Sequence, residues 1–249
     1  MCLTADRQQY TDRAVACFLA QTYSEKRLLI WDTGKIPYRP TSNDFAKGLI
    51  VRGEAATIGA LRNQAAGYLR ESTDIIAHWD SDDWSAPERL SDQIKALDGR
   101  EVVGYNEMLF WNSQTQKAYL YTNTLRGYCI GTSLCYWRKT WEKTPFDETS
   151  AGEDDRWVKL HHCWSRPAMA TYYVHADWIS EDTKTLFEPV IEGTPIPPNL
   201  HQAIPLMVAE VHGGNTHLCD PQQHVDDPTQ AQFTRAPEWD ERLKGLMKL

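Results

Sequence analysis

Short apolar runs alternate with helix-like segments through the first part of the chain, and this alternation restricts the fold more than any other feature. The runs at residues 27–31, 49–51 and 75–79 have the length and hydrophobicity of buried strands. Residues 11–21 and 57–71 repeat apolar side chains at spacings of three and four, which is the pattern of a helix with one buried face. The order predicts an α/β fold, a mostly parallel mixed sheet flanked by helices.

The helix expected after the third apolar run carries its own start signal. Ser85 and Glu88 have the spacing of a capping box, with a proline in the first turn. Leu90, Ile94 and Leu97 supply the apolar stripe of the helix that this box would open. We therefore expect a helix that begins at Ser85.

Further elements are expected in the middle of the chain. Residues 102–111 and 117–121, joined by the polar stretch NSQTQ, predict a hairpin on the same sheet. Residues 129–137 predict another strand, and residues 153–163 a short helix.

The last part of the chain differs in character. Beyond about residue 180 it is rich in proline and polar residues, until Trp239, Leu243 and Leu246 form one stripe within residues 237–249. This stripe predicts an amphipathic helix docked on the rest of the protein. We expect one main domain over residues 1–178 and a C-terminal extension over residues 179–249 packed on it.

Charge and cysteine content exclude some classes of function. A formal net charge of -8 provides no basic field, so stable nonspecific binding of nucleic acid is not expected. The six cysteines show no CxxC spacing and no secretory signal pattern opens the chain, which predicts free thiols in a reducing cytoplasm. No window has the ~18 consecutive apolar residues of a membrane span.

Three aspartates crowd into four positions directly after the strand at residues 75–79. Asp80, Asp82 and Asp83 should lie at the carboxyl end of that strand, where ligands bind in open α/β sheets. Two carboxylates ~4 Å apart repel by ~4 kcal/mol near a protein surface. A hard divalent cation, Mg²⁺ or Mn²⁺, would relieve this repulsion and leave positions for phosphate oxygens.

Other interpretations of the aspartates remain open at this point. A solvated acidic turn that caps the next helix explains them about as well. An EF-hand loop fits poorly, because Trp84 and Ser85 occupy its fifth and sixth places. A phosphatase-type nucleophile lacks a nearby residue to hold the phosphoryl group.

Five segments together resemble family 2 glycosyltransferases in order and spacing. They are LTADR from Leu3, LLIWDTGK from Leu28, GALRNQA from Gly59, HWDSDDW from His78 and GEDDRW from Gly152. The resemblance covers roughly residues 2–178 and implies a GT-A fold and a nucleotide-sugar donor, UDP-linked by family habit. It also implies a DXD motif at Asp80 and Asp82 whose carboxylates bind Mn²⁺ or Mg²⁺ on the diphosphate.

The resemblance also implies contacts with the nucleotide sugar. They fall on Thr4, Asp32, Arg62 and Asp80, with Arg62 reaching toward the diphosphate or the nucleotide. The chain departs from the family pattern in two segments, with LTADR in place of PTYNR and DTGK in place of DDGS. Thr33 therefore replaces the second acid of that pair, which affects base recognition.

Catalytic residues follow from the last matching segment. Asp154 holds the position of the family's general base, with Glu153 as the second choice. His212, in the stretch VHGGNT, resembles a histidine that completes the shell of the cation in family members with a C-terminal extension. A dipole-complementing acidic first turn and an ordinary loop histidine are the alternatives.

The leading hypothesis is thus a metal-dependent inverting glycosyltransferase of hexosyltransferase type. Alternatives are a nucleotidyltransferase acting on sugar phosphates, a glycoside hydrolase, and a catalytically inactive protein that binds sugar nucleotides. The acceptor is a hydroxyl on a glycan, a protein or a modified nucleobase. We expect its recognition from residues 119–131 and 180–218, where no known motif is present.

Overall fold

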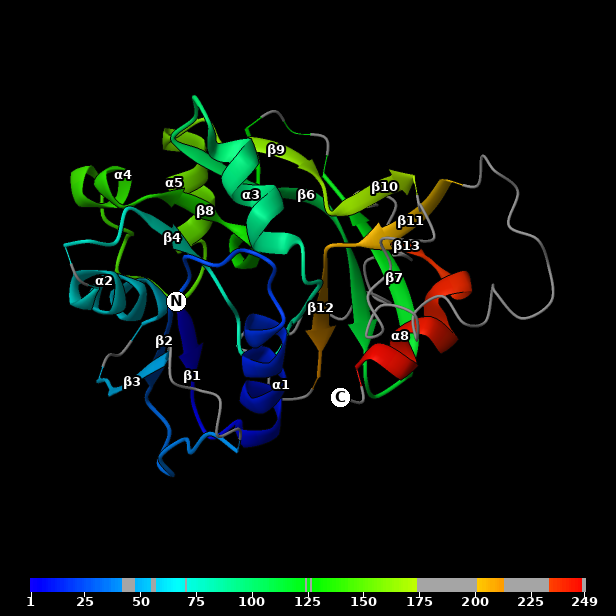
Figure 1. Ribbon diagram of the computed structural model, residues 1–249, viewed down its shortest axis with the longest axis horizontal. Helices are drawn as coiled ribbons and strands as arrows, with labels where there is room; N and C mark the ends of the chain where they lie inside the picture. Colours follow the sequence, from blue (N-terminus) through cyan, green and yellow to red (C-terminus); the bar gives the residue numbers. More distant parts are fainter. Residues whose placement is uncertain are drawn as a thin grey trace.

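The computed structural model describes residues 1–41, 48–54, 57–69, 71–123, 125, 127–173, 201–212 and 233–247. Within these ranges the protein is a mixed α/β structure in which helices flank a parallel sheet, as the alternating pattern predicts. Figure 1 shows helices α2, α4 and α5 at one end of the molecule and strands β7, β10, β11 and β13 at the other. The α/β fold class is therefore confirmed.

The first sheet is parallel, with the order β1-β2-β3. Its strands are β1 (Cys2–Thr4), β2 (Leu28–Asp32) and β3 (Gly48–Arg52), and helices α1 (Gln8–Leu19) and α2 (Ile58–Tyr68) follow β1 and β3. Strand β4 (Ile75–Ala77) runs beside β1. The hydrogen bond from the amide of Trp79 to Met1 O, at 2.9 Å, joins the two segments. This contact brings the turn after β4 next to the end of β1.

Helices cover both faces of this sheet. Ile30 of β2 joins the apolar cluster that contains Phe18 of α1, whereas its neighbour Leu29 joins the cluster that contains Ala65 of α2. Successive side chains of a strand point to opposite faces, so the continuous apolar run of β2 feeds both clusters.

The second sheet is mixed and contains the expected hairpin of β6 and β7. Strand β6 pairs in parallel with β9 and β12, and its pairs with β7 and β8 are antiparallel. The order is β13-β7-β6-β12-β5, with β4, β8 and β9 attached through β8 and β6. The bounds are β5 (Trp84–Ser85), β6 (Val102–Asn112), β7 (Lys117–Thr122), β8 (Cys135–Trp137), β9 (Trp164–Pro167), β12 (Met207–Val211) and β13 (Phe233–Arg235).

The remaining elements are short. Strands β10 (Met169–Tyr173) and β11 (His201–Pro205) form a separate antiparallel pair. The remaining helices are α3 (Arg89–Leu97), α4 (Arg138–Lys143), α5 (Glu153–Leu160) and α8 (Asp240–Leu246), with the 3-10 turn η4 (Pro237–Trp239) before α8. Leu243 and Leu246 of α8 are buried in the main apolar cluster.

Strand β12 comes from the region expected to form the extension, yet it lies inside the second sheet. It occupies the place between β6 and β5, pairing Val208 with both Leu109 and Trp84. Residues 174–200 and 213–232 lie outside the described ranges. The division at residue 178 therefore stays a prediction.

Two local predictions are wrong. The helix expected from Ser85 begins at Arg89, because Trp84 and Ser85 pair with β12 as strand β5 and Arg89 donates to the Ser85 hydroxyl at 2.9 Å. The strand expected over residues 129–137 is a 3-10 turn, η2 (Gly131–Ser133), followed by β8. In this turn the Ser133 hydroxyl accepts a hydrogen bond from the backbone amide of Tyr105 at 2.8 Å.

The prediction of free thiols is also wrong for one pair. Cys129 and Cys163 form a disulfide with their Cα atoms 6.3 Å apart, because the segments before η2 and β9 lie side by side against β6. Cys2, Cys17 and Cys135 are free and buried, and Cys219 lies outside the described residues. A disulfide is uncommon in a reducing cytoplasm, so the cysteines give no support to that predicted compartment. Among the described residues, no helix is long and apolar enough to cross a bilayer.

Candidate active site

A cavity of about 810 Å³ opens at the carboxyl ends of the parallel strands. Its wall includes Thr4 at the end of β1, Thr33 after β2 and the aspartate turn after β4. Arg62 of α2 and the first turn of α5 complete this side of the wall. The topology therefore brings together segments that are far apart in sequence, at the edge of the sheet where ligands bind in such folds.

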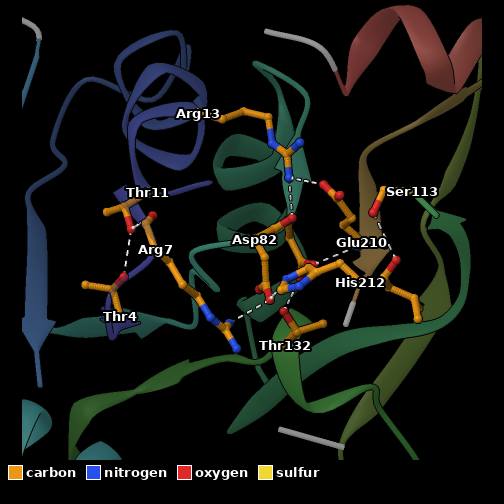
Figure 2. A network of polar contacts seen from close by, with 11 residues as sticks. Thr4, Arg7, Thr11, Arg13, Asp82, Ser113, Thr132, Glu210 and His212 are labelled. Carbon is orange, nitrogen blue, oxygen red and sulfur yellow. Dashed lines mark hydrogen bonds and ion pairs between the residues drawn. The ribbon is translucent and has the colours of Figure 1, made fainter. Parts of the chain in front are cut away.

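Asp82 is the centre of a network of polar contacts (Figure 2). Arg7 Nη1 donates to Asp82 Oδ2 at 2.7 Å, and His212 Nε2 lies 3.1 Å from the same oxygen. The ring of His212 stacks on Tyr10, with centroids 4.4 Å apart. Burial opposes ionisation of Asp82, but the hydrogen bond from His212 and the charge of Arg7 hold its pKa below the ordinary value.

Asp83 points to the other side of the turn. Thr132 Oγ1 donates to Asp83 Oδ2 at 2.5 Å, and the amide of Glu210 donates to Asp83 Oδ1 at 3.2 Å. Burial, together with the charges of Asp82 and Asp80, raises the pKa of Asp83 well above its usual range. Burial likewise raises the pKa of Asp80, against the opposing charge of Arg62. This electrostatic arrangement favours an additional positive charge next to the turn.

Arg13 of α1 supports the aspartate turn from behind. Its guanidinium is almost fully buried and donates through Nη2 to Glu210 Oε2 at 2.6 Å and to the backbone oxygen of Asp82 at 2.5 Å. Figure 2 shows Arg13 reaching from α1 between Asp82 and Glu210. The pair of Arg13 and Glu210 thus joins α1, the turn and β12.

Removing the charge of Arg13 is expected to destabilise the protein strongly. Arg13→Met should lower the free energy of unfolding by about 3 to 5 kcal/mol, because Glu210 loses its buried counter-charge. Urea unfolding followed by circular dichroism measures this. The double variant Arg13→Met, Glu210→Leu should recover most of the loss, since a hydrophobic pair can replace a buried ion pair. Equal losses in the single and double variants would contradict this account of the pair.

Glu153 and Asp154 lie in the first turn of α5, on the same cavity. Glu153 Oε1 is 3.3 Å from Arg62 Nε. Burial raises the pKa of Glu153, against the opposing charge of Arg62. Asp154 Oδ1 accepts from the amide of Asp155 at 2.9 Å. Its other oxygen lies against Gly131, where an added Cβ would come within 1.6 Å of it, so this approach requires glycine.

Arg62 connects the two acidic groups of the cavity. The sequence places it on the polar side of α2, but the structure buries it to 6% exposure. Burial disfavours its charge, yet Asp80, Glu153 and Asp154 raise its pKa above the ordinary value. Burial, together with the charge of Arg62, holds the pKa of His78 well below its usual range. Arg62 therefore stays cationic between the aspartate turn and α5.

The residues predicted to contact the nucleotide have different surroundings in the structure. Thr4 lines the cavity and its hydroxyl lies 2.7 Å from that of Thr11. Asp32 is buried, and its carboxylate accepts from the amides of Gly34 and Tyr38 at 2.9 and 2.8 Å and from Arg52 at 2.5 Å. This carboxylate shapes the loop after β2, and its predicted contact with a nucleotide stays a prediction.

Several site residues were missed from the sequence. Arg7 belongs to a segment that was recognised, but nothing local indicated its partner Asp82. Arg13, Thr132 and Glu210 reach the site only through folding. Trp157 of α5 is packed in the core, with its ring centroid 4.7 Å from that of Phe146.

The residues of the cavity fit a divalent cation only if water and phosphate oxygens complete its coordination shell. Within the described ranges, no three His, Cys, Asp or Glu side chains are arranged to hold a metal by themselves. Asp82 and His212 nevertheless lie within 3.1 Å of each other beside two further carboxyl groups. Mg²⁺ commonly takes one or two carboxylates and completes its shell with water and substrate phosphates. The donor set suits a cation of that kind, whose shell is completed by water and phosphate oxygens.

Comparisons with known proteins were made for the whole chain. No protein-family model matches it, and no curated protein has a significantly similar sequence. Similar solved structures include S. aureus TarS in complex with UDP, with 13% identity, a TM-score of 0.49, and coverage of 67% of this chain and 56% of that chain. The complex of TarS with UDP-GlcNAc gives 13% identity, a TM-score of 0.49, and coverage of 79% and 67%.

A third similar structure is the mannosyltransferase PcManGT from Pyrobaculum calidifontis in complex with GDP-Man and Mn²⁺. Its identity is 13%, its TM-score 0.48, and the match covers 79% of this chain and 64% of that chain. The chain thus spans 56 to 67% of the length of the chains in these three structures. Likenesses of this size assign no family.

Proposed function

We propose that this protein is a metal-dependent inverting glycosyltransferase with a GT-A fold, which moves a hexose from a UDP-sugar to a hydroxyl acceptor. The observation that carries the proposal is the single cavity that holds the aspartate turn and, across Arg62, the carboxyl groups of α5. The resemblance of the five sequence segments to family 2 glycosyltransferases supports it independently, because all five fall on or beside this cavity.

Sugar transfer with inversion requires two groups in one cavity. One binds the diphosphate leaving group, and the other is a base that takes the proton of the acceptor. The turn at Asp80 and Asp82, with His212, is suited to hold Mn²⁺ or Mg²⁺. Such a cation, when bound, supplies Lewis-acid stabilisation of the leaving diphosphate. Arg62 places a fixed positive charge beside the same group, and Thr4 lines the nucleotide side.

The proton of the acceptor hydroxyl has to be removed on the opposite side of the sugar carbon. Asp154 is the residue proposed for this role, because it lines the cavity and makes no ion pair with Arg62, unlike Glu153. Its Oδ1 accepts from the amide of Asp155, and its Oδ2 lies against Gly131. General-base catalysis of this kind contributes ~10² to 10⁴ to the rate.

Donor hydrolysis without acceptor tests the proposal. The purified protein is incubated with UDP-, GDP- and TDP-sugars, with Mn²⁺ or with EDTA, and release of the nucleoside diphosphate is measured. We expect slow release from one UDP-sugar that depends on the cation. Release of pyrophosphate from a nucleoside triphosphate and a sugar phosphate would favour a nucleotidyltransferase. Cleavage of glycosides in EDTA would favour a hydrolase, and binding without turnover an inactive sugar-nucleotide-binding protein.

A further inference from the structure

The far wall of the cavity is aromatic, and none of the matching sequence segments contributes to it. Phe110 of β6, Tyr121 of β7 and Phe233 of β13 line it together with Tyr128. Tyr121 and Phe233 lie directly opposite each other in the antiparallel pair of β7 and β13, which places their rings on one face of the sheet. We refer to these four residues as the aromatic wall.

The rings of the aromatic wall form one continuous surface. The centroids of Tyr121 and Phe233 are 5.0 Å apart, and those of Phe110 and Phe233 are 5.2 Å apart, edge to face. Tyr121 Oη donates to Tyr128 Oη at 3.2 Å, so the surface ends in a pair of hydroxyl groups. Tyr121 and Phe233 are largely buried, at 8% and 7% exposure, so this side of the cavity offers apolar ring surface bordered by hydroxyl groups.

The aromatic wall is also next to the proposed base. Tyr128 precedes Gly131 by one short turn, and Asp154 lies against Gly131. A ring held on the wall would thus have its hydroxyl groups within the part of the cavity that contains Asp154. The aspartate turn, by contrast, lies between β4 and β5 and contributes none of the four rings.

Charge restricts what this part of the cavity can bind. The described lining has six carboxyl groups and two guanidinium groups: Asp80, Asp82, Asp83, Glu153, Asp154 and Glu210 against Arg7 and Arg62. Both arginines are engaged by carboxylates, Arg7 by Asp82 and Arg62 by Glu153. Among the described residues that line the cavity, Arg7 and Arg62 are the only cations, so a phosphate or carboxylate against the rings gains no further ion pair from this lining.

We propose that the aromatic wall is the acceptor subsite and that the acceptor is an uncharged sugar ring, packed against this wall at Tyr128 beside Asp154. The apolar C–H face of a pyranose packs on aromatic rings, and its hydroxyl edge requires polar neighbours such as the paired tyrosine hydroxyls and Asp154. This assignment of the acceptor rests on the proposed glycosyltransferase function.

Saturation-transfer NMR of the full chain with Mg²⁺ and UDP tests the proposal. The probes are the methyl glycosides of glucose, galactose, mannose and N-acetylglucosamine, with glucose 6-phosphate as the charged counterpart. We expect binding of at least one glycoside, and binding of glucose 6-phosphate that is about tenfold weaker or absent. Tyr128→Ala should weaken glycoside binding about tenfold, by loss of one ring contact.

Tyr68→Ala is the matched control, because Tyr68 is 52% exposed and lies outside this cavity. Its glycoside binding should equal that of the unmodified protein, and thermal melting should show both variants folded. Tight binding of glucose 6-phosphate, full binding by Tyr128→Ala, or no binding of any glycoside would each overturn the assignment.

The donor-hydrolysis experiment distinguishes failure of the acceptor assignment from failure of the proposed glycosyltransferase function. Donor hydrolysis without glycoside binding removes only the acceptor assignment. Absence of both donor binding and donor hydrolysis removes the glycosyltransferase function, and the acceptor assignment with it.

Discussion

Asp82→Asn is expected to abolish cation-dependent binding of the nucleotide sugar and to lower transfer about 10³-fold. The physical reason is that Asp82 faces the cavity with its pKa held low, so it is the carboxylate of the turn that is charged and oriented for a cation. Loss of Lewis-acid stabilisation is worth several kcal/mol, and about 4 kcal/mol corresponds to about 10³ in rate. Isothermal titration calorimetry with UDP, with and without Mn²⁺, measures the binding component.

Asp83→Asn provides the comparison within the same turn. An asparagine at this position can still accept from the amide of Glu210 through its carbonyl oxygen, and its amide can donate to the hydroxyl of Thr132. Because the pKa of Asp83 is already raised well above normal, loss of its charge should matter much less. The assignment of Asp82 as the cation ligand is wrong if Asp83→Asn loses cation-dependent binding and Asp82→Asn retains it.

Asp154→Asn is expected to leave binding of the donor intact and to lower transfer by ~10² to 10⁴. The side chain lines the cavity from α5, so under the proposed function its charge is expected to serve proton removal and not diphosphate binding. The measurement is a comparison of the dissociation constant for UDP with the turnover number under saturating donor and acceptor.

Asp155→Asn is the matched control for this variant. Asp155 is the next residue of α5 and forms an exposed ion pair with Lys159 at 2.6 Å, which contributes ~0.5 kcal/mol or less. Near-normal transfer is expected. Glu153→Gln tests the second candidate, and it should also disturb Arg62, to which Glu153 is paired. Near-normal turnover in Asp154→Asn together with inactivity in Glu153→Gln would move the proposed base to Glu153.

Long regular elements were predictable, and local signals at their ends were less reliable. The apolar periodicity identified α2 and the hairpin of β6 and β7 because each pattern extends over many residues. The capping box at Ser85 failed for a specific reason. Trp84 and Ser85 gain strand hydrogen bonds from β12, a segment more than one hundred residues later, and a local signal carries no information on that partner.

The residues of the candidate site also fall into two groups, those that the sequence identified and those that it did not. Asp80 and Asp82 could be named in advance because three acids crowd directly after a strand, and Asp154 because its segment resembles the family motif. Arg13 and Glu210 could not, because each looks like an ordinary charged residue until folding buries it. The aromatic wall was equally hidden, as its four rings come from three strands and a loop.

The sequence by itself determined the α/β class, the turn of aspartates at a strand end and the acidic start of α5, because these depend on periodicity and on the spacing of neighbouring residues. Only the tertiary structure decided that Arg7 and His212 share Asp82, that Arg62 is buried between two acidic groups, and that Cys129 bonds Cys163. These contacts join residues far apart in the chain, and each depends on a partner that only folding brings near, which no local pattern contains.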